Sequence, residues 1–362
     1  MDDLAWMRRA LALAEGGRYT AAPNPLVGCV LVRDGQPVGQ GFHRRAGEGH
    51  AEVLALAEAG PRAAGATAYV TLEPCAHHGR TPPCVEALIG AGVARVVAAM
   101  ADPNPRVAGQ GLAQLRAADI AVDCGVLADE AAALNPGFLK RMATGRPYVR
   151  VKMAQSLDGH SALADGASRW ITGPAARADV QRWRARSQAI VTGVGTVLAD
   201  DPQLTVRDVP DAPQPLRVVL DSRLSAPPDA RLLREPGATL IVTRSPDGGR
   251  GADLAAAGAE MFALPGTAHG VDLGALLDEL GRRECNEVLV EAGPRVAGAF
   301  LAAGLTDELI VYVAPHLLGQ GARPAFELPA VARMADRLDL TPLDVLSFGP
   351  DLRLRLRPAA RA

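Results

Sequence analysis

Three residues able to bind one metal ion constrain this sequence of 362 residues more than any other feature. They are His50, which begins the segment His-Ala-Glu, and two cysteines, Cys75 and Cys84, of which the first follows a proline. One imidazole and two thiolates can bind a Zn²⁺ ion and leave its fourth coordination position open for water. We therefore expect a zinc site made of His50, Cys75 and Cys84.

Glu52 ends the His-Ala-Glu segment and is expected to transfer protons rather than to bind the metal. A His-x-Glu segment, a later Pro-Cys pair and a Glu that is not a ligand are typical of zinc-dependent nucleobase deaminases. Here Ala-His-His-Gly-Arg-Thr-Pro-Pro separates Cys75 from Cys84, a departure from the usual Cys-x-x-Cys spacing. The pattern predicts hydrolytic deamination with Glu52 as the general acid and base.

The segments around these residues predict how they could meet. Residues two apart do not share a face of a regular helix, so His50 and Glu52 can face one substrate only if His50 begins the helix. Gly47-Glu48-Gly49 directly before it permits such a start. The apolar run 68–72 predicts a strand leading toward Cys75, and 85–89 predicts a helix after Cys84.

Composition argues against several kinds of partner. With 38 basic and 40 acidic residues, a net charge of -2 argues against a nucleic-acid or anionic-membrane surface. Five cysteines form no regular pattern, and we find no signal peptide or long uncharged apolar run. We therefore expect a soluble cytoplasmic protein with no membrane partner, in which Cys29, Cys124 and Cys285 are simply buried.

Turn signals divide the chain into two expected domains, 1–146 and 147–362, at Gly145-Arg146-Pro147. The alternation of strands and helices in the first domain predicts an α/β sandwich. Predicted strands there are 26–32, 37–42, 94–99 and 120–124, the first two joined as a hairpin by Asp34-Gly35, and predicted helices are 2–18, 109–117 and 129–141. In the second domain, 148–153 and 189–196 predict strands and 173–186 a helix.

Longer motifs resemble one family along nearly the whole chain. The stretch PCAHHGRTPPC, with PNPLVGCVLV before it and ADPNPRVAGQGL after it, resembles the deaminase half of the bifunctional RibD enzymes of riboflavin biosynthesis. The resemblance continues through KMAQSLDG, TVLADDP and VEAGPRVAGAFL to YVAPHLLG. It implies a cytidine-deaminase-like three-layer α/β sandwich followed by an α/β domain similar to dihydrofolate reductase, which uses NADPH.

The same resemblance implies binding residues in the second domain. Positions for the nicotinamide cofactor NADPH would be Ala154, Trp170, Thr196, Asp200, Ser222, Gly293, Pro294, Arg295, Val296, Ala297, Gly298 and Ala299. Substrate positions would be Ser168, Arg184, Leu204, Arg207 and Glu291, with Arg184 and Arg207 as phosphate ligands. The residues alone are less specific, because the glycines after the apolar runs 189–192 and 288–291 fit either a dinucleotide site or ordinary strand-to-helix turns.

Three residues of the first domain are candidates for substrate binding. Asn24, between two prolines, either hydrogen-bonds a pyrimidine edge or caps a turn. His43, at a predicted strand end, either contacts substrate or is structural. Arg80, inside the cysteine segment, is a candidate for the substrate phosphate, while His77 and His78 are assigned to loop structure or to support of the metal ligands.

Lys152 and Asp200 are the candidates for proton transfer or positioning in the reductase. Only Lys140 and Lys152 are lysines among the 38 basic residues, so Lys152 either serves where a compact ammonium is needed or remains by chance. Reduction of a ribosyl carbon requires prior opening of the sugar and hence a proton transfer. Asp200 could instead accept a hydrogen bond from the cofactor ribose.

The predicted function is zinc-dependent deamination of the diamino-hydroxy-phosphoribosylaminopyrimidine, followed by NADPH-dependent reduction to 5-amino-6-(5-phosphoribitylamino)uracil, by a homo-oligomer whose partners are small molecules. Two other classes stay open. A nucleoside or tRNA deaminase with a binding module would release ammonia without consuming NADPH. A ligand-binding protein of the same fold would have lost the chemistry, against which the intact set of His50, Glu52, Cys75 and Cys84 argues.

Overall fold

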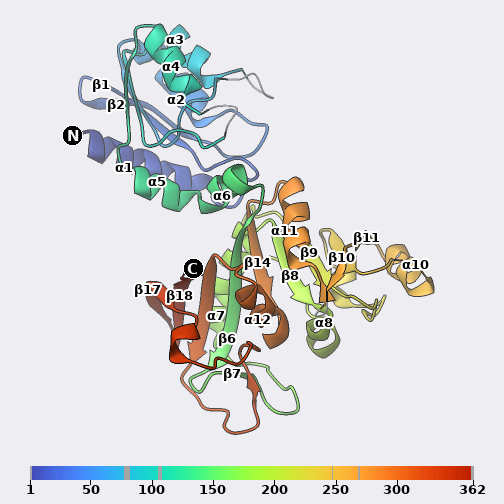
Figure 1. Ribbon diagram of the computed structural model, residues 1–362. Coiled ribbons are helices and arrows are strands. Elements are labelled where there is room, and N and C mark those ends of the chain that lie inside the picture. Colours follow the sequence, from blue (N-terminus) through green and yellow to red (C-terminus); the bar gives the residue numbers. More distant parts are fainter. Residues whose placement is uncertain (1, 77–81, 105–107, 247, 268–269, 360–362) are drawn as a thin grey trace. The chain divides into compact units, whose positions relative to one another are not determined.

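The computed structural model describes residues 2–76, 82–104, 108–246, 248–267 and 270–359. These residues form two compact units, Met1–Gly145 and Arg146–Ala362 (Figure 1). Each unit has its own sheet and its own apolar core. The two units are described separately below.

The first unit contains a five-stranded sheet in the order β2-β1-β3-β4-β5. Strands β1 and β2 form the predicted antiparallel hairpin, in which Asp34 and Gly35 both have positive φ. Strand β1 is also antiparallel to β3, whereas β3, β4 and β5 run parallel to one another. The strands are β1 (Gly28–Arg33), β2 (Gln36–Phe42), β3 (Thr67–Val70), β4 (Arg95–Ala98) and β5 (Ala121–Cys124).

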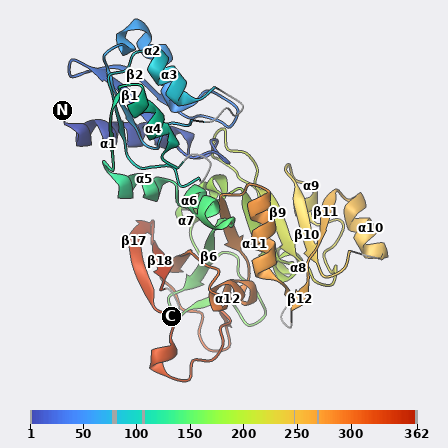
Figure 2. The same ribbon diagram turned by 45° about the horizontal axis from the view of Figure 1, so that its top comes forward.

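Helices cover both faces of this sheet. Successive residues of a strand point to opposite faces, so alternate residues of β1 contact different helices. Cys29 and Leu31 of β1 pack with α2, α3 and α4, whereas Val30 and Val32 pack with α1 and α5. The layers can be followed in Figures 1 and 2, and they confirm the predicted three-layer sandwich. The helices are α1 (Asp3–Ala14), α2 (Ala51–Ala59), α3 (Cys84–Gly90), α4 (Gln110–Ala117), α5 (Ala128–Leu134) and α6 (Pro136–Thr144), with short 3-10 turns η1 (Glu15–Gly17) and η2 (Gly60–Ala63).

Two sequence predictions for this unit were wrong. The single helix expected over 129–141 is divided into α5 and α6 at Asn135, because Pro136 cannot continue the hydrogen bonding of the preceding helix. The buried amide of Asn135 instead accepts from Leu26 N at 2.7 Å and donates to Leu26 O at 2.9 Å. Cys124 is exposed rather than buried, since it ends the edge strand β5.

The second unit contains a nine-stranded sheet in the order β11-β10-β9-β8-β14-β6-β15-β18-β17. Strands β11 to β15 in this order are parallel, and the edge strands β18 and β17 are antiparallel. The strands are β6 (Tyr148–Ser156), β8 (Ala189–Gly193), β9 (Leu216–Leu220), β10 (Thr239–Thr243), β11 (Ala259–Ala263), β14 (Glu287–Glu291), β15 (Glu308–Ala314), β17 (Leu340–Phe348) and β18 (Asp351–Pro358). Short strands are β7 (His160–Ala162), β12 (Gly266–Thr267), β13 (Gly270–Val271) and β16 (Arg323–Pro324).

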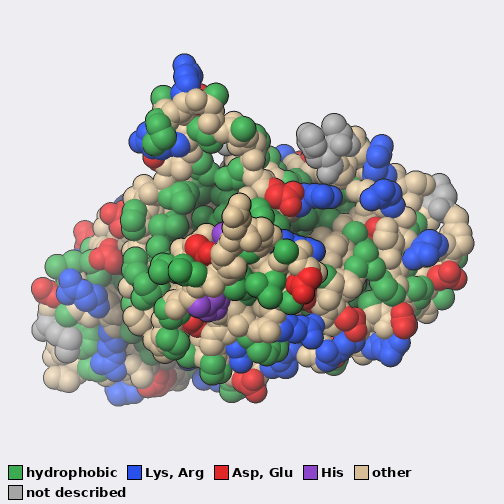
Figure 3. Space-filling view, turned by 90° about the horizontal axis from the view of Figure 1, so that it is seen from below, with side chains coloured by type: hydrophobic (Ala, Val, Ile, Leu, Met, Phe, Trp, Pro, Cys, Tyr) green, Lys and Arg blue, Asp and Glu red, His purple; other side chains and the backbone are tan. Residues whose placement is uncertain are grey.

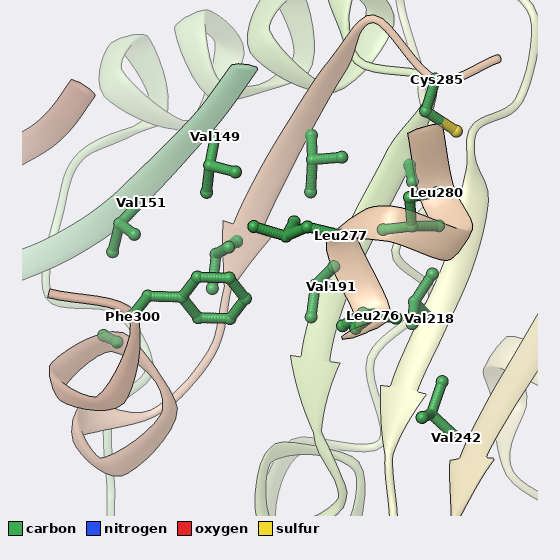
Figure 4. Packing of buried hydrophobic residues seen from close by; sticks show 14 of the residues in the cluster. Val149, Val151, Val191, Val218, Val242, Leu276, Leu277, Leu280, Cys285 and Phe300 are labelled. Carbon is green, nitrogen blue, oxygen red and sulfur yellow. The ribbon is translucent and has the colours of Figure 1, made fainter. Parts of the chain in front are cut away.

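The main core of the second unit lies between this sheet and two helices. Figure 4 shows Leu276, Leu277 and Leu280 of α11 and Phe300 of α12 packed against valines of the central strands, such as Val191. Helix α7 packs on the opposite face through Trp183. The helices are α7 (Pro174–Arg186), α8 (Val194–Asp200), α9 (Arg231–Arg234), α10 (Gly249–Ala256), α11 (Leu273–Arg282) and α12 (Pro294–Ala302), with the 3-10 turn η3 (Met334–Asp336).

The order of the strands predicts where the second unit binds ligands. Strand β14 enters the sheet between β8 and β6, although it follows both in the chain. In open α/β sheets, ligands bind outside the carboxyl ends of the strands, at the point where the order of the strands along the sheet reverses. The carboxyl ends of β6, β8 and β14 are therefore the expected site.

The distribution of surface charge agrees with the nearly equal numbers of basic and acidic residues, 38 and 40. Figure 3 shows a face on which basic and acidic side chains are intermixed rather than gathered by sign. Among the described helices, none combines the length and the apolar character needed to cross a lipid bilayer.

Candidate functional site

The three predicted metal ligands converge in the first unit. Nδ1 of His50 lies 3.2 Å from Sγ of Cys84 and 3.5 Å from Sγ of Cys75. In a tetrahedral zinc site, Zn–N bonds of about 2.0–2.1 Å and Zn–S bonds of about 2.3 Å would separate nitrogen and sulfur by about 3.6 Å. The donor atoms therefore fit a zinc ion. Among the residues that the structure describes, this is the only group of His, Cys, Asp or Glu found close enough to hold a metal ion.

Two helix starts and one strand end place these ligands. His50 is the N-cap of α2, with an extended backbone, and Cys84 is the first residue of α3. Cys75 follows β3, and its sulfur accepts a hydrogen bond from Cys84 N at 3.3 Å. Because helix N-termini stabilise negative charge, the hydrogen bond from Cys84 N favours a thiolate at Cys75. His50 thus lies at the start of its helix. This is the position from which His50 and Glu52 were predicted to face one substrate.

Glu52 lies in the first turn of α2 and is 3% exposed. Burial raises its pKa to about 7, although His50 and a hydrogen bond with Cys84 act in the opposite direction. A carboxyl group with a pKa near neutrality can both accept and return a proton. Between the two thiols, hydrogen bonding by Cys84 lowers the pKa of Cys75 to about 4, and the same hydrogen bond, together with burial, raises that of Cys84.

Asn24 and His43 lie next to the metal ligands. Nδ2 of Asn24 is 3.0 Å from Nε2 of His43, whose Nδ1 is 3.2 Å from the carbonyl oxygen of Gly49. The His43 ring packs edge-on against the His50 ring, with 5.3 Å between the ring centres, and His43 is 2% exposed. Both ring nitrogens of His43 are thus engaged within the protein, which favours its structural alternative. The candidate Arg80, with its neighbours His77 and His78, lies outside the described residues.

In the second unit, a charged cluster lies at the expected edge of the sheet. Glu291, the last residue of β14, is in register with Lys152 of β6, and Lys152 Nζ is 3.8 Å from its carboxylate. Arg184 donates two hydrogen bonds to the same carboxylate, at 2.6 and 2.9 Å, and a third to Thr205 O at 3.0 Å. The guanidinium of Arg184 is therefore occupied within the protein.

Burial and neighbouring charge act against each other in this cluster. Burial lowers the pKa of Lys152 and Arg184 lowers it further, whereas Glu291 raises it. Burial alone would raise the pKa of Glu291, but Arg184 and Lys152 bring it below its usual value. Glu291 is therefore held as a carboxylate beside an ammonium that loses its proton more readily than usual, which suits proton transfer at Lys152.

Several predicted cofactor residues lie where strands β8 and β14 lead into helices α8 and α12. Gly293 N donates to Thr196 Oγ1 at 3.2 Å, and a Cβ at Gly193 would lie 2.9 Å from Val296 Cγ2. The turns after β8 and β14 are thus adjacent, and Ser222 follows the next strand, β9. They present backbone N–H groups and the start of α12, which together suit a phosphate group.

Part of the implied cofactor run has other contacts. Ala297 is fully buried in the apolar core, and a Cβ at Gly298 would lie 1.9 Å from Glu327 O. These two residues therefore pack α12 against its own unit. The positions open to a cofactor are in the first turn of the helix, where Arg295 is exposed, and Ala299 is partly buried one turn later.

The other implied residues of the second unit lie in two loops and on β6. Trp170 is 69% exposed, with the Arg177 guanidinium 4.6 Å from its ring centre. Arg169, next to it, donates a hydrogen bond to Asp200 O and so joins the loop to the end of α8. The loop also contains Ser168, which is partly buried, and Ala154 lies on β6 beyond Lys152.

Leu204 and Arg207 differ in what they can offer a ligand. Leu204 is 3% exposed and has a positive φ of 51°, so its side chain belongs to the core. Arg207 is exposed, and its Nη1 donates to Gln203 Oε1 at 2.8 Å and Thr205 Oγ1 at 3.2 Å. Arg207 also contributes to the lowered pKa of Glu291, which places its charge near the cluster.

The sequence analysis missed Glu73, a buried carboxylate next to Pro74-Cys75. Among the described residues, its carboxylate accepts hydrogen bonds from the backbone N–H groups of Asp102, Gly109, Gly111 and Leu112. An acidic residue between an apolar strand and a metal ligand is the signal that could have drawn attention to it. Its partners could not be deduced from the pattern.

Comparisons with known proteins agree with this arrangement. A family model described as the cytidine and deoxycytidylate deaminase zinc-binding region matches residues 1–100, and the RibD C-terminal domain model matches 147–354. The riboflavin biosynthesis protein RibD of Escherichia coli (strain K12) is 50% identical over 368 residues, covering 98% of this chain and 99% of its own length. RibD of Haemophilus influenzae is 47% identical over 370 residues, with coverages of 99% and 98%.

Solved structures match over the same length. Acinetobacter baumannii RibD, form 1, is 49% identical, with a TM-score of 0.92 and 99% of each chain covered. A diaminohydroxyphosphoribosylaminopyrimidine deaminase/5-amino-6-(5-phosphoribosylamino)uracil reductase from Thermotoga maritima is 32% identical, with a TM-score of 0.88 and the same coverage.

The chain therefore combines a zinc-binding deaminase domain with a reductase domain, and it is a bifunctional enzyme with hydrolase and oxidoreductase activities whose cofactors are zinc and NADPH. These matches cover at least 98% of both chains, at identities of 32% to 50%. The chain belongs to the RibD family of bifunctional deaminase and reductase enzymes of riboflavin biosynthesis.

Proposed function

We propose that the two activities divide between residues 1–146, which carry the deaminase, and 147–362, which carry the reductase. The substrate would be the diamino-hydroxy-phosphoribosylaminopyrimidine, and the product 5-amino-6-(5-phosphoribitylamino)uracil. The observation that carries the proposal is the convergence of His50, Cys75 and Cys84, with Glu52 buried beside them. The division is supported by the charged cluster around Lys152, which belongs wholly to the second unit.

In the deaminase, Glu52 would move the protons. Zinc held by His50, Cys75 and Cys84 supplies a water of lowered pKa for attack on the amino-bearing carbon. Glu52 accepts a proton from that water as the new carbon–oxygen bond forms, and it donates the proton to the amino group as the carbon–nitrogen bond breaks and ammonia leaves. Asn24 would hydrogen-bond the pyrimidine, which its contact with His43, itself beside His50, supports.

Replacement of the Glu52 carboxylate separates this role from metal binding. Glu52→Gln should keep zinc and lower the rate of ammonia release by about 10²–10⁴-fold, because the amide cannot carry the proton. NADPH oxidation with the deaminated intermediate should be unchanged. Glu58→Gln, on the same helix but exposed, is the matched control and should retain both activities. Loss of zinc from the Glu52 variant, measured by elemental analysis, would refute the assigned role.

In the reductase, Lys152 would protonate the ring oxygen of the ribosyl group as the carbon–oxygen bond breaks, so that the sugar opens to a protonated imine. NADPH supplies the hydride that the resulting carbon accepts. Glu291 and Arg184 would orient Lys152, since both are fixed by their mutual ion pair. The exposed Arg207 is better placed than Arg184 to bind the substrate phosphate. Asp200, joined to the Trp170 loop through Arg169, would accept a hydrogen bond from the cofactor ribose.

The two lysines of the chain offer a matched test. Lys152→Ala should lower the reductase rate by about 10²–10⁴-fold, if the ammonium transfers the proton that opens the sugar. Lys140→Ala removes the only other lysine and should leave the rate unchanged. Reductase rates come from NADPH absorbance with the deaminated intermediate, and ammonia release reports on the first unit. Wild-type reductase kinetics in the Lys152 variant would remove that residue from the mechanism.

We also propose that the chain forms a homo-oligomer through residues 327–347, and that it acts on small molecules in the cytoplasm, where zinc-binding thiolates stay reduced. Nearly all residues of this stretch are exposed, although it is rich in apolar side chains. Contiguous exposed apolar surface marks association sites. The apolar side chains, 37% to 76% exposed, are Leu328, Val331, Met334, Leu340, Leu343, Val345 and Leu346.

A second copy of this chain is the partner that the topology favours. Strand β17 is the edge of the nine-stranded sheet, and two such edges can pair antiparallel around a two-fold axis. Such pairing would cover the same apolar side chains on both copies. No nucleic-acid partner is proposed, since the charges are balanced.

Substitution on β17 tests this surface. Val345→Arg should shift the mass measured by light scattering after size exclusion from oligomer toward monomer, because a buried unpaired charge is costly. Leu4→Arg introduces the same charge at an exposed leucine of α1 and should leave the mass unchanged. A monomeric wild-type protein at micromolar concentration would contradict the proposal.

A further inference from the structure

The chemistry above assigns no part to Glu73, a carboxylate that is 3% exposed and lies three residues after the end of β3. Its Oε2 accepts hydrogen bonds from Asp102 N at 3.0 Å and Gly109 N at 2.9 Å. Its Oε1 accepts from Gly111 N at 2.9 Å and Leu112 N at 3.3 Å. Four backbone donors, all within the described residues, therefore satisfy this buried carboxylate.

Glu73 supplies the cap that helix α4 lacks. The helix begins at Gln110, and its N-cap, Gly109, makes no side-chain capping bond. The first N–H groups of a helix have no partner within the helix, and a carboxylate is stabilised near them. Glu73 takes two of these groups, from residues 111 and 112, although it lies in a different part of the chain.

Gly111 lets α4 approach the peptide group that precedes a metal ligand. A Cβ at Gly111 would lie 2.1 Å from Pro74 O and 3.2 Å from Glu73 Oε1, so no side chain fits there. Pro74 is followed directly by Cys75. The first turn of α4 therefore packs against the backbone that carries this ligand.

On its other side Cys75 contacts the start of α3, where its sulfur accepts from Cys84 N and its carbonyl oxygen accepts from Val85 N, each at 3.3 Å. Strand β3 ends at Val70, and residues 73–76 belong to no helix or strand. The backbone of Glu73 also donates to Met100 O at 2.9 Å, just beyond the neighbouring strand β4. The contacts of Glu73 and Pro74 thus hold the backbone that precedes Cys75, and the start of α3 holds Cys75 itself.

We infer that Glu73 is a positioning residue of the deaminase, which helps to fix Cys75 as a metal ligand by holding the segment after β3 against the first turn of α4. The inference rests on the proposed zinc ligands. Glu73 touches neither metal nor substrate, so its effect is on how tightly and in what geometry the metal is held.

Two substitutions disturb this contact from opposite sides in the full-length zinc protein. Glu73→Gln leaves one acceptor oxygen and turns an NH₂ donor toward backbone N–H groups, so hydrogen bonds are lost. Gly111→Ala keeps the carboxylate but pushes α4 away from Pro74. The control is Asp221→Asn, a fully buried carboxylate of the second unit that accepts from Ala226 N at 2.7 Å.

The readouts are the rate of zinc transfer to a chromogenic chelator and the visible spectrum after replacement of zinc by Co²⁺. Loss of support for a ligand should speed zinc release by about 10- to 100-fold in Glu73→Gln and Gly111→Ala, and shift the cobalt bands that report ligand geometry. Asp221→Asn should behave as wild type in both measurements. Retained NADPH oxidation in the two variants would show that the second unit is folded.

Wild-type zinc release and an unchanged cobalt spectrum in either folded variant would overturn the inference. Equally fast release from Asp221→Asn would also overturn it, since the effect would then be one of general stability. A wild-type protein without bound zinc would refute the proposed ligands themselves, and this inference with them.

Discussion

The first unit must bring one nitrogen and two sulfur atoms close enough together to bind one metal ion. The three donors come from separate segments of the chain. Two of them begin helices, where unpaired N–H groups favour negative charge, and the third follows a strand. The three-layer sandwich brings these two helix starts close to the segment that follows β3, with Glu52 buried beside them.

The second unit uses buried charge in two different ways. Arg150 is 1% exposed and bonds to both Glu287 and Glu308, so its charge is fully compensated and serves the fold. Lys152, two residues along the same strand, lies 3.8 Å from Glu291, which is already paired with Arg184. Because a charge left incompletely paired in a buried site favours a change of protonation, chemistry is expected at Lys152 rather than at Arg150.

The sequence predicted features that arise from local physics. Asp34-Gly35 fixes the first hairpin through backbone conformation, and the glycines before His50 allow the helix to begin there. Other features depend on partners far along the chain and could not be predicted. The carboxylate of Glu73 meets backbone groups 29 to 39 residues away, and Arg184 meets Glu291 at a separation of 107. The pairing of Arg184 is the reason for proposing Arg207 in its place as the phosphate ligand.

The central claim is that a metal ion bound by His50, Cys75 and Cys84 serves the first reaction and not the second. Treatment of the full-length protein with a chelator, followed by metal analysis and both assays, tests it most directly. We predict that zinc removal abolishes ammonia release, that NADPH-dependent reduction of the deaminated intermediate continues, and that added Zn²⁺ restores deamination. Deamination by demonstrably metal-free protein would contradict the account.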